Sequence, residues 1–343
     1  MEGSFLSANT AAGFYSVYED LANPEHGDKI WYIKGGPGNG KSTFMRRTGE
    51  AAEAAGHHVE YFLCSGDPDS LDGIYIRELK TAYVDATAPH VQEPSLPGIS
   101  GRYLDLSQFY RNTASLDSDA IAVLLRGYRE QYARAYDLLA AAGRADPLSI
   151  PGAITRETRE RLYEVGREYA LRLLPPGRGV DRSRRFISAI SCLGSISLPG
   201  IAYANGVVCL VNSAHWLAGA MDACLEKNQR LILCPDPLQP EKIDGLILPD
   251  TGISFLMAHK GVRYPSGKTR HVSAETGVEG SMAAEYRQAK SVQTSLLRMA
   301  FASLKKAKEL HDALEAAYRP AVDFKALDRF TARHIREHIG SQK

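Results

Sequence analysis

One segment of the sequence has the residue types and spacing of a phosphate-binding loop. It matches the Walker A pattern G-x-x-x-x-G-K-[ST] without a mismatch. The segment runs Gly35-Gly36-Pro37-Gly38-Asn39-Gly40-Lys41-Ser42-Thr43. Glycines let successive backbone N–H groups curl around an anion, and the N-terminus of the following helix adds partial positive charge. The segment Gly35 to Thr43 is therefore predicted to bind the phosphates of a nucleotide.

Two side chains of this segment have distinct expected roles. Lys41 is expected to contact the β- and γ-phosphates as a binding and catalytic group, and Ser42 is expected to offer its hydroxyl to Mg²⁺. A short apolar run, Ile30 to Ile33, precedes the loop, and a helix is predicted from Phe44 to Ala55, ending at Gly56. This strand–loop–helix order favours nucleotide binding over the alternative, a glycine-rich turn without a ligand.

The sequence also offers carboxylates for the magnesium ion. A third strand is predicted over Lys80 to Val84, and it runs into Asp85 in the manner of a Walker B strand. Asp85 is therefore the candidate catalytic and metal-binding carboxylate, with a loop cap as the alternative. Its rivals lie in a predicted polar loop, Ser65 to Gly73, where each could instead stabilise an Asx turn. These rivals are Asp67, Asp69 and Asp72.

Two blocks of sequence recur in the same order in the second half of the chain. Phe5 to Gly13 recurs as Phe186 to Gly194, with four identities in nine positions. Asp67 to Gly73 recurs as Gln239 to Gly245. A repeat of this length and order indicates a duplicated α/β unit.

The second copy lacks the residues that carry chemistry in the first. Its first strand is predicted at Val207 to Val211, with a helix to about Asn228, and neither a lysine nor a glycine run lies between them. The alignment of the repeats places Met257 where Asp85 stands in the first copy. The second half is therefore predicted to fold as a degenerate unit without a phosphate or metal site.

The elements around these motifs predict an α/β fold of duplicated, three-layer units of the P-loop NTPase type. Each unit is expected to contain a mainly parallel sheet followed by a helical hairpin. The first is predicted over residues 1–177, with its hairpin at about 118–174, and the second over 178–343, with its hairpin at about 281–339. Pro175-Pro176-Gly177 is the predicted linker.

Composition sets limits on the class of protein. With 343 residues, 44% of them hydrophobic, and 41 basic against 40 acidic side chains, the chain is typical of a two-domain globular protein. A net charge of +1 argues against a nucleic-acid partner. The chain has no apolar run of roughly 18 residues and no recognisable leader, so we expect a cytoplasmic protein with no membrane partner. The five cysteines lack metal-ligand spacing and are expected to be reduced.

Several blocks outside the loop carry a family resemblance: Ser65 to Gly73, Asp85 to His90, Pro97-Gly98, and the tail from Lys308 to Phe324. Together they resemble a bacterial family of tandem P-loop ATP-binding proteins, described as ATPases and sometimes labelled nucleotide kinases. The resemblance spans most of the chain and implies ATP binding at Gly35 to Thr43. The second half departs from the family because other members can keep a phosphate loop there.

Three functions are compatible with these features. The first is a Mg²⁺-dependent ATPase whose hydrolysis switches the arrangement of the halves or of the helical hairpins, through which a protein partner could bind. The second is a nucleotide-kinase-type phosphotransferase, with the loop Asp67 to Gly73 orienting a small-molecule acceptor. The third is an ATP sensor that rarely hydrolyses. Loss of the second phosphate loop favours the switch.

The degenerate half is also expected to act on the first. Ser188 to Gly194 is expected to lie near the γ-phosphate, together with a basic side chain from Arg182, Arg184 or Arg185. The alternative for these arginines is a solvated linker.

Overall fold

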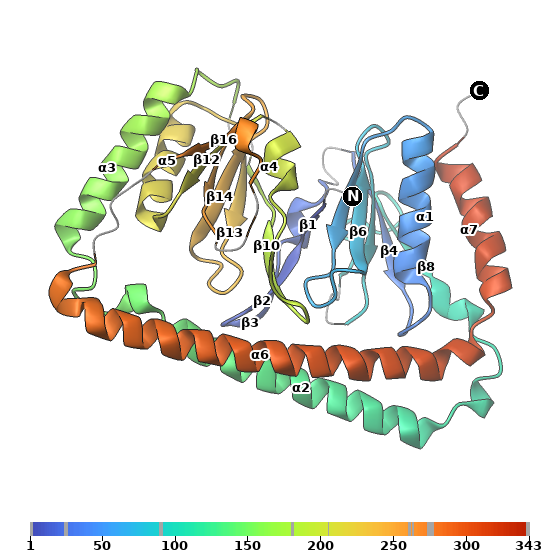
Figure 1. The fold of residues 1–343 in the computed structure, drawn as a ribbon. Helices are drawn as coiled ribbons and strands as arrows, with labels where there is room; N and C mark the ends of the chain where they lie inside the picture. Colours follow the sequence, from blue (N-terminus) through green and yellow to red (C-terminus); the bar gives the residue numbers. More distant parts are fainter. Residues whose placement is uncertain are drawn as a thin grey trace.

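Two α/β units lie side by side in the computed structural model, and two long helices run beneath both of them (Figure 1). The structure describes residues 3–23, 27–88, 92–179, 182–204, 206–259, 262, 264–272 and 278–340. Pro89 and His90, which belong to one block of the family resemblance, lie outside these residues. The predicted α/β class and the predicted duplication are confirmed.

The first unit is built on a six-stranded sheet. In sheet order its strands are β1 (Gly3–Phe5), β5 (Val59–Leu63), β6 (Leu71–Ile76), β7 (Thr81–Asp85), β4 (Lys29–Lys34) and β8 (Gly101–Asp105). Five strands are parallel to one another and β6 is antiparallel, so the sheet is mainly parallel as predicted. Helix α1 (Lys41–Ala54) packs against β5, β6 and β7. Buried apolar side chains dominate β4 and β7, as is usual for strands covered on both faces.

The second unit repeats this plan. Its strands, in the same spatial order from the other end, are β9 (Arg182–Arg184), β13 (Leu231–Pro235), β14 (Ile243–Leu248), β15 (Ile253–Met257), β12 (Val207–Val211) and β16 (Thr269–His271). Here β14 is the antiparallel strand. Helix α5 (Ala214–Glu226) takes the place of α1, and a short helix, α4 (Gly200–Ala204), precedes β12.

The strand register confirms that Met257 in the second unit takes the position of Asp85 in the first. Asp85 lies opposite Ile33 in the first sheet, and Met257 lies opposite Val211 in the second. Six residues, 35–40, connect β4 to α1, whereas two residues, 212–213, connect β12 to α5. The connection that would hold a phosphate is therefore shortened in the second unit, while the strands on either side are kept.

One strand was not predicted. The expected polar loop Ser65 to Gly73 ends earlier, because Leu71 begins the antiparallel strand β6. The sequence does not indicate this strand because Asp72 and Gly73 are residue types typical of turns. In the structure Asp72 is buried, and its Oδ2 accepts a hydrogen bond from the Ser7 hydroxyl at 3.5 Å.

A strand hairpin from each unit meets the other unit at the centre of the molecule. The hairpins are β2 (Ser7–Thr10) with β3 (Gly13–Ser16), and β10 (Ser188–Ser191) with β11 (Gly194–Ser197). Both turns place a glycine at a φ of +100°, Gly13 in one and Gly194 in the other, a value that glycine adopts without strain. The repeated sequence block therefore encodes the same turn twice.

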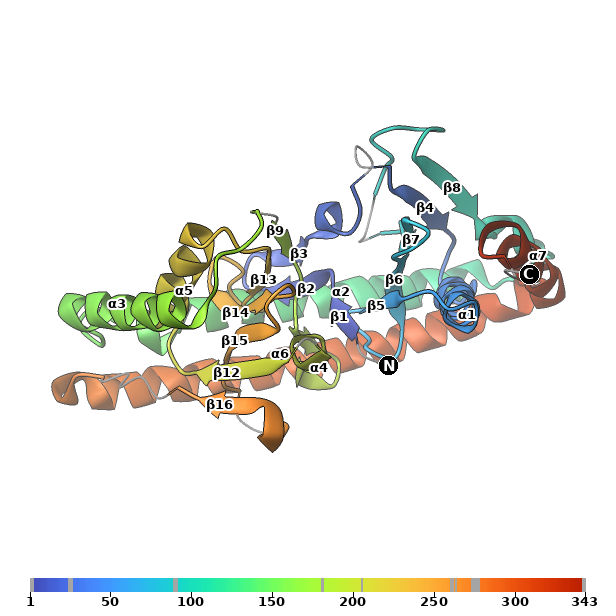
Figure 2. The ribbon, with the colours of Figure 1, turned by 90° about the horizontal axis from the view of Figure 1, so that it is seen from above.

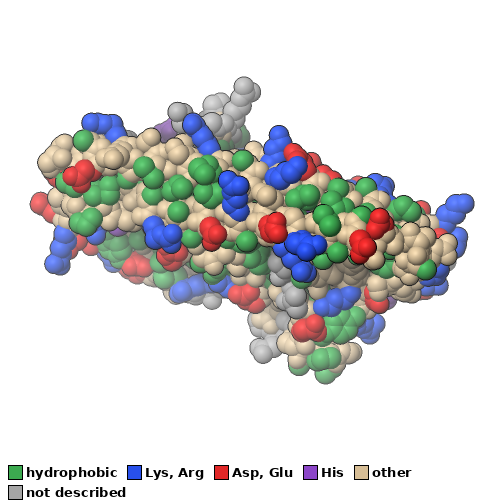
Figure 3. All heavy atoms as spheres, turned by 90° about the horizontal axis from the view of Figure 1, so that it is seen from below, with side chains coloured by type: hydrophobic (Ala, Val, Ile, Leu, Met, Phe, Trp, Pro, Cys, Tyr) green, Lys and Arg blue, Asp and Glu red, His purple; other side chains and the backbone are tan. Residues whose placement is uncertain are grey.

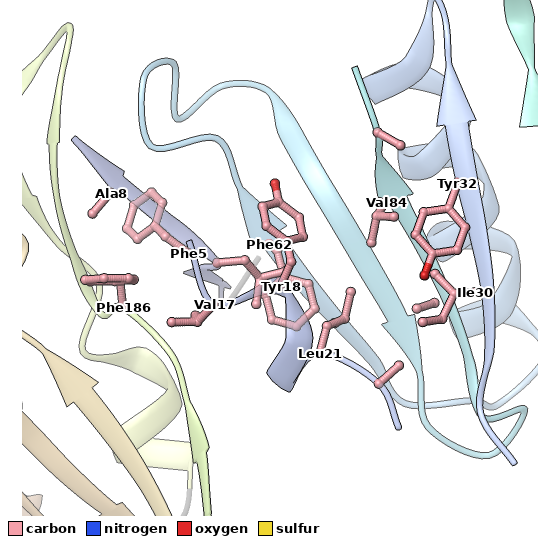
Figure 4. Packing of buried hydrophobic residues seen from close by; sticks show 14 of the residues in the cluster. Phe5, Ala8, Val17, Tyr18, Leu21, Ile30, Tyr32, Phe62, Val84 and Phe186 are labelled. Carbon is pink, nitrogen blue, oxygen red and sulfur yellow. The ribbon is translucent and has the colours of Figure 1, made fainter. Parts of the chain in front are cut away.

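Equivalent residues of the two units contact each other reciprocally. The backbone N–H of Phe5 donates to the carbonyl of Phe186 at 2.8 Å, and that of Phe186 donates back to Phe5 at 2.9 Å. Their side chains join one hydrophobic cluster across the junction, with Val17 and Phe62 on the first-unit side (Figure 4). Reciprocal contacts of this kind are those of an isologous dimer, here within one chain.

The helices cross between the units. Helices α2 (Ser118–Arg144) and α6 (Ala283–Tyr318) are antiparallel and lie side by side under both sheets (Figures 1 and 2). Helix α3 (Arg156–Leu173) packs on α5 of the second unit, and α7 (Phe324–His338) packs on α1 of the first. The hairpins expected within each half are thus replaced by pairs between halves. The reason is length: at 1.5 Å per residue, α2 spans about 40 Å and α6 about 54 Å, so each carries the chain to the opposite unit.

Short 3-10 helices fill the connections. They are η1 (Tyr18–Asp20), η3 (Leu106–Phe109), η4 (Thr113–Ser115), η5 (Pro147–Ser149), η6 (Ser266–Lys268), η7 (Gly280–Met282) and η8 (Arg319–Ala321). None of the described helices is both long enough and apolar enough to cross a membrane. All five cysteines are free thiols, and four of them are buried.

Candidate functional site

The glycine-rich loop, residues 35–40, leaves the carboxyl end of β4 and leads directly into α1. Gly38 has a φ of +67° and Gly40 a φ of +81°, which are left-handed values that favour glycine. Gly40 caps α1, and its carbonyl accepts a hydrogen bond from Phe44 N at 2.8 Å. The glycines at these two positions thus allow the chain to turn tightly from strand into helix.

Lys41 and Asp85, the two predicted catalytic residues, lie together beside this loop. The Nζ of Lys41 donates to the carbonyls of Gly35 at 2.9 Å and Gly36 at 3.1 Å. The same Nζ lies 3.6 Å from Oδ2 of Asp85, and both side chains are mostly buried. They meet because β4 and β7 are adjacent and parallel, so that their carboxyl ends share one edge of the sheet.

Asp85 is held from its other side. Its Oδ1 accepts hydrogen bonds from the backbone N–H of Thr87 at 2.9 Å and from the Thr87 hydroxyl. One carboxylate oxygen therefore caps the turn after β7, while the second faces the Lys41 ammonium. The loop-cap alternative is observed at Oδ1, and the predicted metal-binding role concerns Oδ2 and stays a prediction.

Ser42, the predicted magnesium ligand, contacts the start of β6. Its Oγ accepts a hydrogen bond from Leu71 N at 3.0 Å. A serine oxygen has two lone pairs, so one remains for a metal ion.

Two of the three rival carboxylates have partners elsewhere. Asp67 forms an ion pair with Lys308 at 3.4 Å, and Asp72 accepts from Ser7 at 3.5 Å. For Asp69 the contact is to the backbone, whose carbonyl accepts from Arg46 at 3.0 Å. Asp72 is only 3% exposed within β6. Asp85 is the carboxylate that the structure pairs with Lys41.

Three of the eight buried side-chain atoms that lack a hydrogen-bond partner among the described residues lie at the loop. Asn39 is 1% exposed, and neither its Nδ2 nor its Oδ1 has a hydrogen-bond partner among the described residues. The buried Tyr110 hydroxyl also lacks one, and it lies 2.5 Å from where a Cβ on Gly36 would stand. Such unpartnered buried groups are rare in folded proteins. They are consistent with a site whose polar ligand completes the network.

The second half of the chain covers the loop. Oε1 of Glu315, on α6, accepts a hydrogen bond from Gly38 N at 3.2 Å. A Cβ on Gly38 would lie 3.0 Å from the Glu315 carbonyl, and a Cβ on Gly40 would lie 2.9 Å from Leu327 on α7. This contact could not be predicted from the sequence, because nothing in a helical pattern indicates a partner 277 positions away.

Glu315 belongs to a charged row on α6. His311, Asp312 and Glu315 bring one possible metal-ligand atom each within 4.8 Å of the others. Lys308 pairs with Asp312 at 2.5 Å as well as with Asp67. An ion at this row would compete with these existing ion pairs.

The arginines expected near the γ-phosphate lie at the junction of the units instead. Arg184 donates to Asp20 at 2.9 Å and to Glu19 at 2.6 Å. Arg185 is buried, and its guanidinium donates to the carbonyls of Asp20 and Arg184. Arg182 is exposed on β9. The expectation is wrong for Arg184 and Arg185, because strand β9 is anchored to the η1 segment of the first unit.

The hairpin Ser188 to Gly194 is also placed differently from expectation. Its Cys192 N–H donates to the Gly66 carbonyl at 3.2 Å, and the Ile190 carbonyl accepts from Asn9 at 2.8 Å. It therefore packs on the other hairpin and on the loop after β5. The side chain that the second half delivers to the glycine-rich loop is acidic, Glu315, rather than basic.

The second unit carries a polar cluster around β14, the counterpart of β6. Buried Asp244 accepts from the Ser188 hydroxyl at 2.7 Å and pairs with His259 Nε2 at 2.8 Å. Burial lowers the pKa of His259, but the hydrogen bond and charge of Asp244 outweigh this and raise it. Burial, with the nearby Asp244, raises the pKa of Asp236 to about 6. Asp244 is the counterpart of Asp72 on the antiparallel strand, and the second unit adds His259 and Asp236 around it.

No protein-family model, curated protein or solved structure matches this chain. The candidate site therefore rests on the residues and the geometry described above.

Proposed function

We propose that the first unit is a P-loop NTPase domain that binds Mg-ATP at Gly35 to Thr43 and hydrolyses it. The observation that carries this proposal is the pairing of Lys41 with Asp85 beside a loop with left-handed glycines. The resemblance to tandem P-loop ATPases supports the same conclusion. The second unit, with a two-residue connection and Met257 at its strand end, binds no nucleotide.

The residues present fit the phosphates of ATP. The Gly38 N–H already binds an anionic oxygen, that of Glu315, so its direction and surroundings suit a phosphate oxygen. Lys41 would exchange the carbonyls of Gly35 and Gly36 for the β- and γ-phosphates, because a phosphate oxygen carries more charge than a carbonyl. Asn39 and Tyr110 supply polar atoms that have no hydrogen-bond partner within the part of the chain that the structure describes.

Ser42 and the Oδ2 of Asp85 would hold Mg²⁺ or its bound water. The ion, when bound, neutralises charge on the β- and γ-phosphates. Thr87 keeps the Asp85 carboxylate in a fixed orientation, and Lys41 stabilises the charge that develops as the phosphoryl group is transferred.

The switch ATPase fits the structure better than the nucleotide-kinase alternative. A kinase would need free acceptor-binding groups in the loop Asp67 to Gly73, but Asp67 pairs with Lys308 and Asp72 is buried. In contrast, α6 connects the glycine-rich loop to the second unit directly. The third alternative, an ATP sensor, differs from the switch only in its rate of hydrolysis.

A protein partner would bind at the long helices. Their outer face carries acidic and basic side chains among apolar ones (Figure 3). Val123, Val292 and Met299 are each exposed on α2 or α6. A mixed surface of this kind suits a protein rather than a nucleic acid, which needs a basic face.

Titration calorimetry with Mg-ATP tests the proposal. The parent protein is expected to bind one equivalent, and Lys41→Ala to abolish binding because the phosphate-bound ammonium is gone. Lys325→Ala, at an exposed lysine of α7, is the matched control and should bind as the parent does. A stoichiometry near two, or unchanged binding by Lys41→Ala, contradicts the proposal. Release of ADP without an added acceptor separates the ATPase from the kinase and from the sensor.

A further inference from the structure

The carboxylate of Glu315 lies where the proposed site needs a phosphate. It accepts the Gly38 N–H, a donor of the predicted phosphate cradle, and it comes from the second half of the chain. The Lys41 ammonium meanwhile donates hydrogen bonds to the carbonyls of Gly35 and Gly36 within the loop. Two donors of the loop, the Gly38 N–H and the Lys41 ammonium, are therefore satisfied from within the protein.

A nucleotide and Glu315 compete for this place. The Glu315 backbone packs so closely on Gly38 that even a methyl group there would lie within 3.0 Å of its carbonyl oxygen. Glu315 also stands in the last turn of α6, where the helix dipole is negative. A triphosphate would meet both a steric obstacle and two sources of negative charge.

Displacement of Glu315 would also move residues outside the glycine-rich loop. Tyr318, one turn further along α6, contacts the ring of Tyr110 at 5.9 Å between centroids. After η8 the chain enters α7, whose Leu327 touches Gly40 and whose His334 packs against Trp31 at 4.9 Å. The end of α6 and the start of α7, here named the α6–α7 corner (residues 315–327), thus contacts the loop at two glycines.

We infer that the α6–α7 corner is an autoinhibitory cap on the nucleotide site, with Glu315 standing in for a phosphate oxygen. This inference rests on the proposed function. Mg-ATP binds by expelling the carboxylate, and the 36-residue helix α6 transmits the movement of the corner to the second unit. The degenerate half therefore controls access to the site of the active half.

Removing the charge of Glu315 tests the cap. A hydrogen bond to a charged group contributes about 1.5–3 kcal/mol, which corresponds to about a tenfold to hundredfold change in affinity. Glu315→Gln and Glu315→Ala are therefore expected to bind Mg-ATP at least tenfold more tightly than the parent in calorimetry. The control, Glu309→Gln, changes an exposed carboxylate six positions earlier on the same helix and should leave the affinity unchanged.

A second readout reports the movement itself. Trp31 lies against His334 and His338 of α7, whereas the other tryptophan, Trp216, is buried in the second unit. Tripolyphosphate with Mg²⁺, which carries the phosphates without a base, should change Trp31 fluorescence in the parent. Glu315→Ala should show part of this change without any ligand.

The outcomes separate the cap from the proposed function. If the parent and the Glu315 variants bind Mg-ATP with equal affinity, or the variants bind more weakly, the cap is wrong and the nucleotide site stands. If none of them binds Mg-ATP, both are wrong. Tighter binding by the Glu315 variants but not by Glu309→Gln supports the cap.

Discussion

The two units share a strand order and a hairpin, yet they differ in the few residues at one edge of the sheet. Asp72 and Asp244 occupy equivalent strands, are both buried, and both accept a hydrogen bond from the serine of a hairpin. Because this buried aspartate is present in both units, including the one without the glycine-rich loop, it supports the shared fold rather than the candidate site. Asp85, replaced by Met257, and Lys41, which has no counterpart in the two-residue connection, belong to the site alone.

The comparison extends to the helices. Each unit is covered by a helix from the other half, α7 on α1 and α3 on α5. The first of these pairs touches the glycine-rich loop, and it is rich in titratable rings. Each pair also has an ion pair at 2.6 Å, Arg47 with Asp328 in the first and Arg167 with Glu226 in the second. The difference between the two ends is therefore the loop that the first pair touches and the second unit lacks.

The largest effect is expected from separating the halves. A fragment of residues 1–177 lacks α6 and α7, and should not fold cooperatively. The buried side chains it loses include Leu304, Leu314, Val322, Leu327 and Ile339. At about 1.5–3 kcal/mol each, they contribute as much as the whole stability of a typical domain, about 5–15 kcal/mol. Circular dichroism during denaturation measures this, and mixing with a 178–343 fragment should restore the fold. A cooperative, monomeric 1–177 fragment would show that the exchanged helices are dispensable.

Asp85→Asn is expected to retain most of the nucleotide affinity, because the backbone donors of the loop are intact. Its ATP turnover should fall by roughly 10²-fold or more, the usual loss when one preorganised electrostatic group is removed. The matched control is the equivalent position of the other unit, where Met257→Leu should leave turnover unchanged. Unchanged turnover in Asp85→Asn would move the metal role to Asp67, Asp69 or Asp72.

Lowering the pH should destabilise the packing of α7 on α1 in the first unit more than that of α3 on α5 in the second. Burial, with the nearby His338, lowers the pKa of His334 to about 4, and its Nε2 is hydrogen-bonded to the Tyr83 hydroxyl at 2.9 Å. Histidine in the unfolded chain has a pKa of about 6.5, so between these values the unfolded state binds the extra proton. The free energy of unfolding should therefore fall as pH drops from about 6.5 to 4, by up to about 3 kcal/mol.

Denaturant titrations across this pH range, with hydrogen exchange, measure the effect. The amides of α7 should lose protection before those of α3. The control His334→Gln keeps a hydrogen-bonding side chain without titrating in this range, so its stability should depend less on pH. Equal pH dependence in the parent and in His334→Gln would contradict this role for His334.

The smallest effect is expected from removing the serine partners of Asp72 and Asp244, the buried carboxylates that the two units have in common. Ser188→Ala removes a 2.7 Å hydrogen bond from buried Asp244 and should cost about 1–3 kcal/mol of unfolding free energy. Ser7→Ala removes a longer contact, 3.5 Å, from Asp72 and should cost less. Chemical denaturation compares the two. If neither change affects stability, the serine–aspartate pairs do not support the fold.

Much of the site could be predicted from the sequence because its chemistry is local. The predicted cradle, its lysine and the start of its helix lie within nine consecutive residues, and the strand that ends in Asp85 is mostly apolar. The duplication was visible in the repeated blocks, and its register placed Met257 correctly. The sequence does not predict the antiparallel strand β6 because Asp72 and Gly73 are typical of loops, and the polar partners of this buried aspartate, such as Ser7, come from elsewhere in the chain.

The α/β class, the two units and the predicted phosphate loop can be read from the amino-acid sequence, since they follow from hydrophobic runs, glycine positions and short-range spacing. Long-range packing instead sets which helix covers which unit, that Arg184 binds the η1 segment, and that Glu315 reaches Gly38. An amphipathic helix records which face is buried but not against what. The partner of each covering helix follows from the lengths of α2 and α6 and from the packing of Phe5 on Phe186. The long helices carry the chain from one unit to the other, and the Phe5–Phe186 contact sets how the two units lie together.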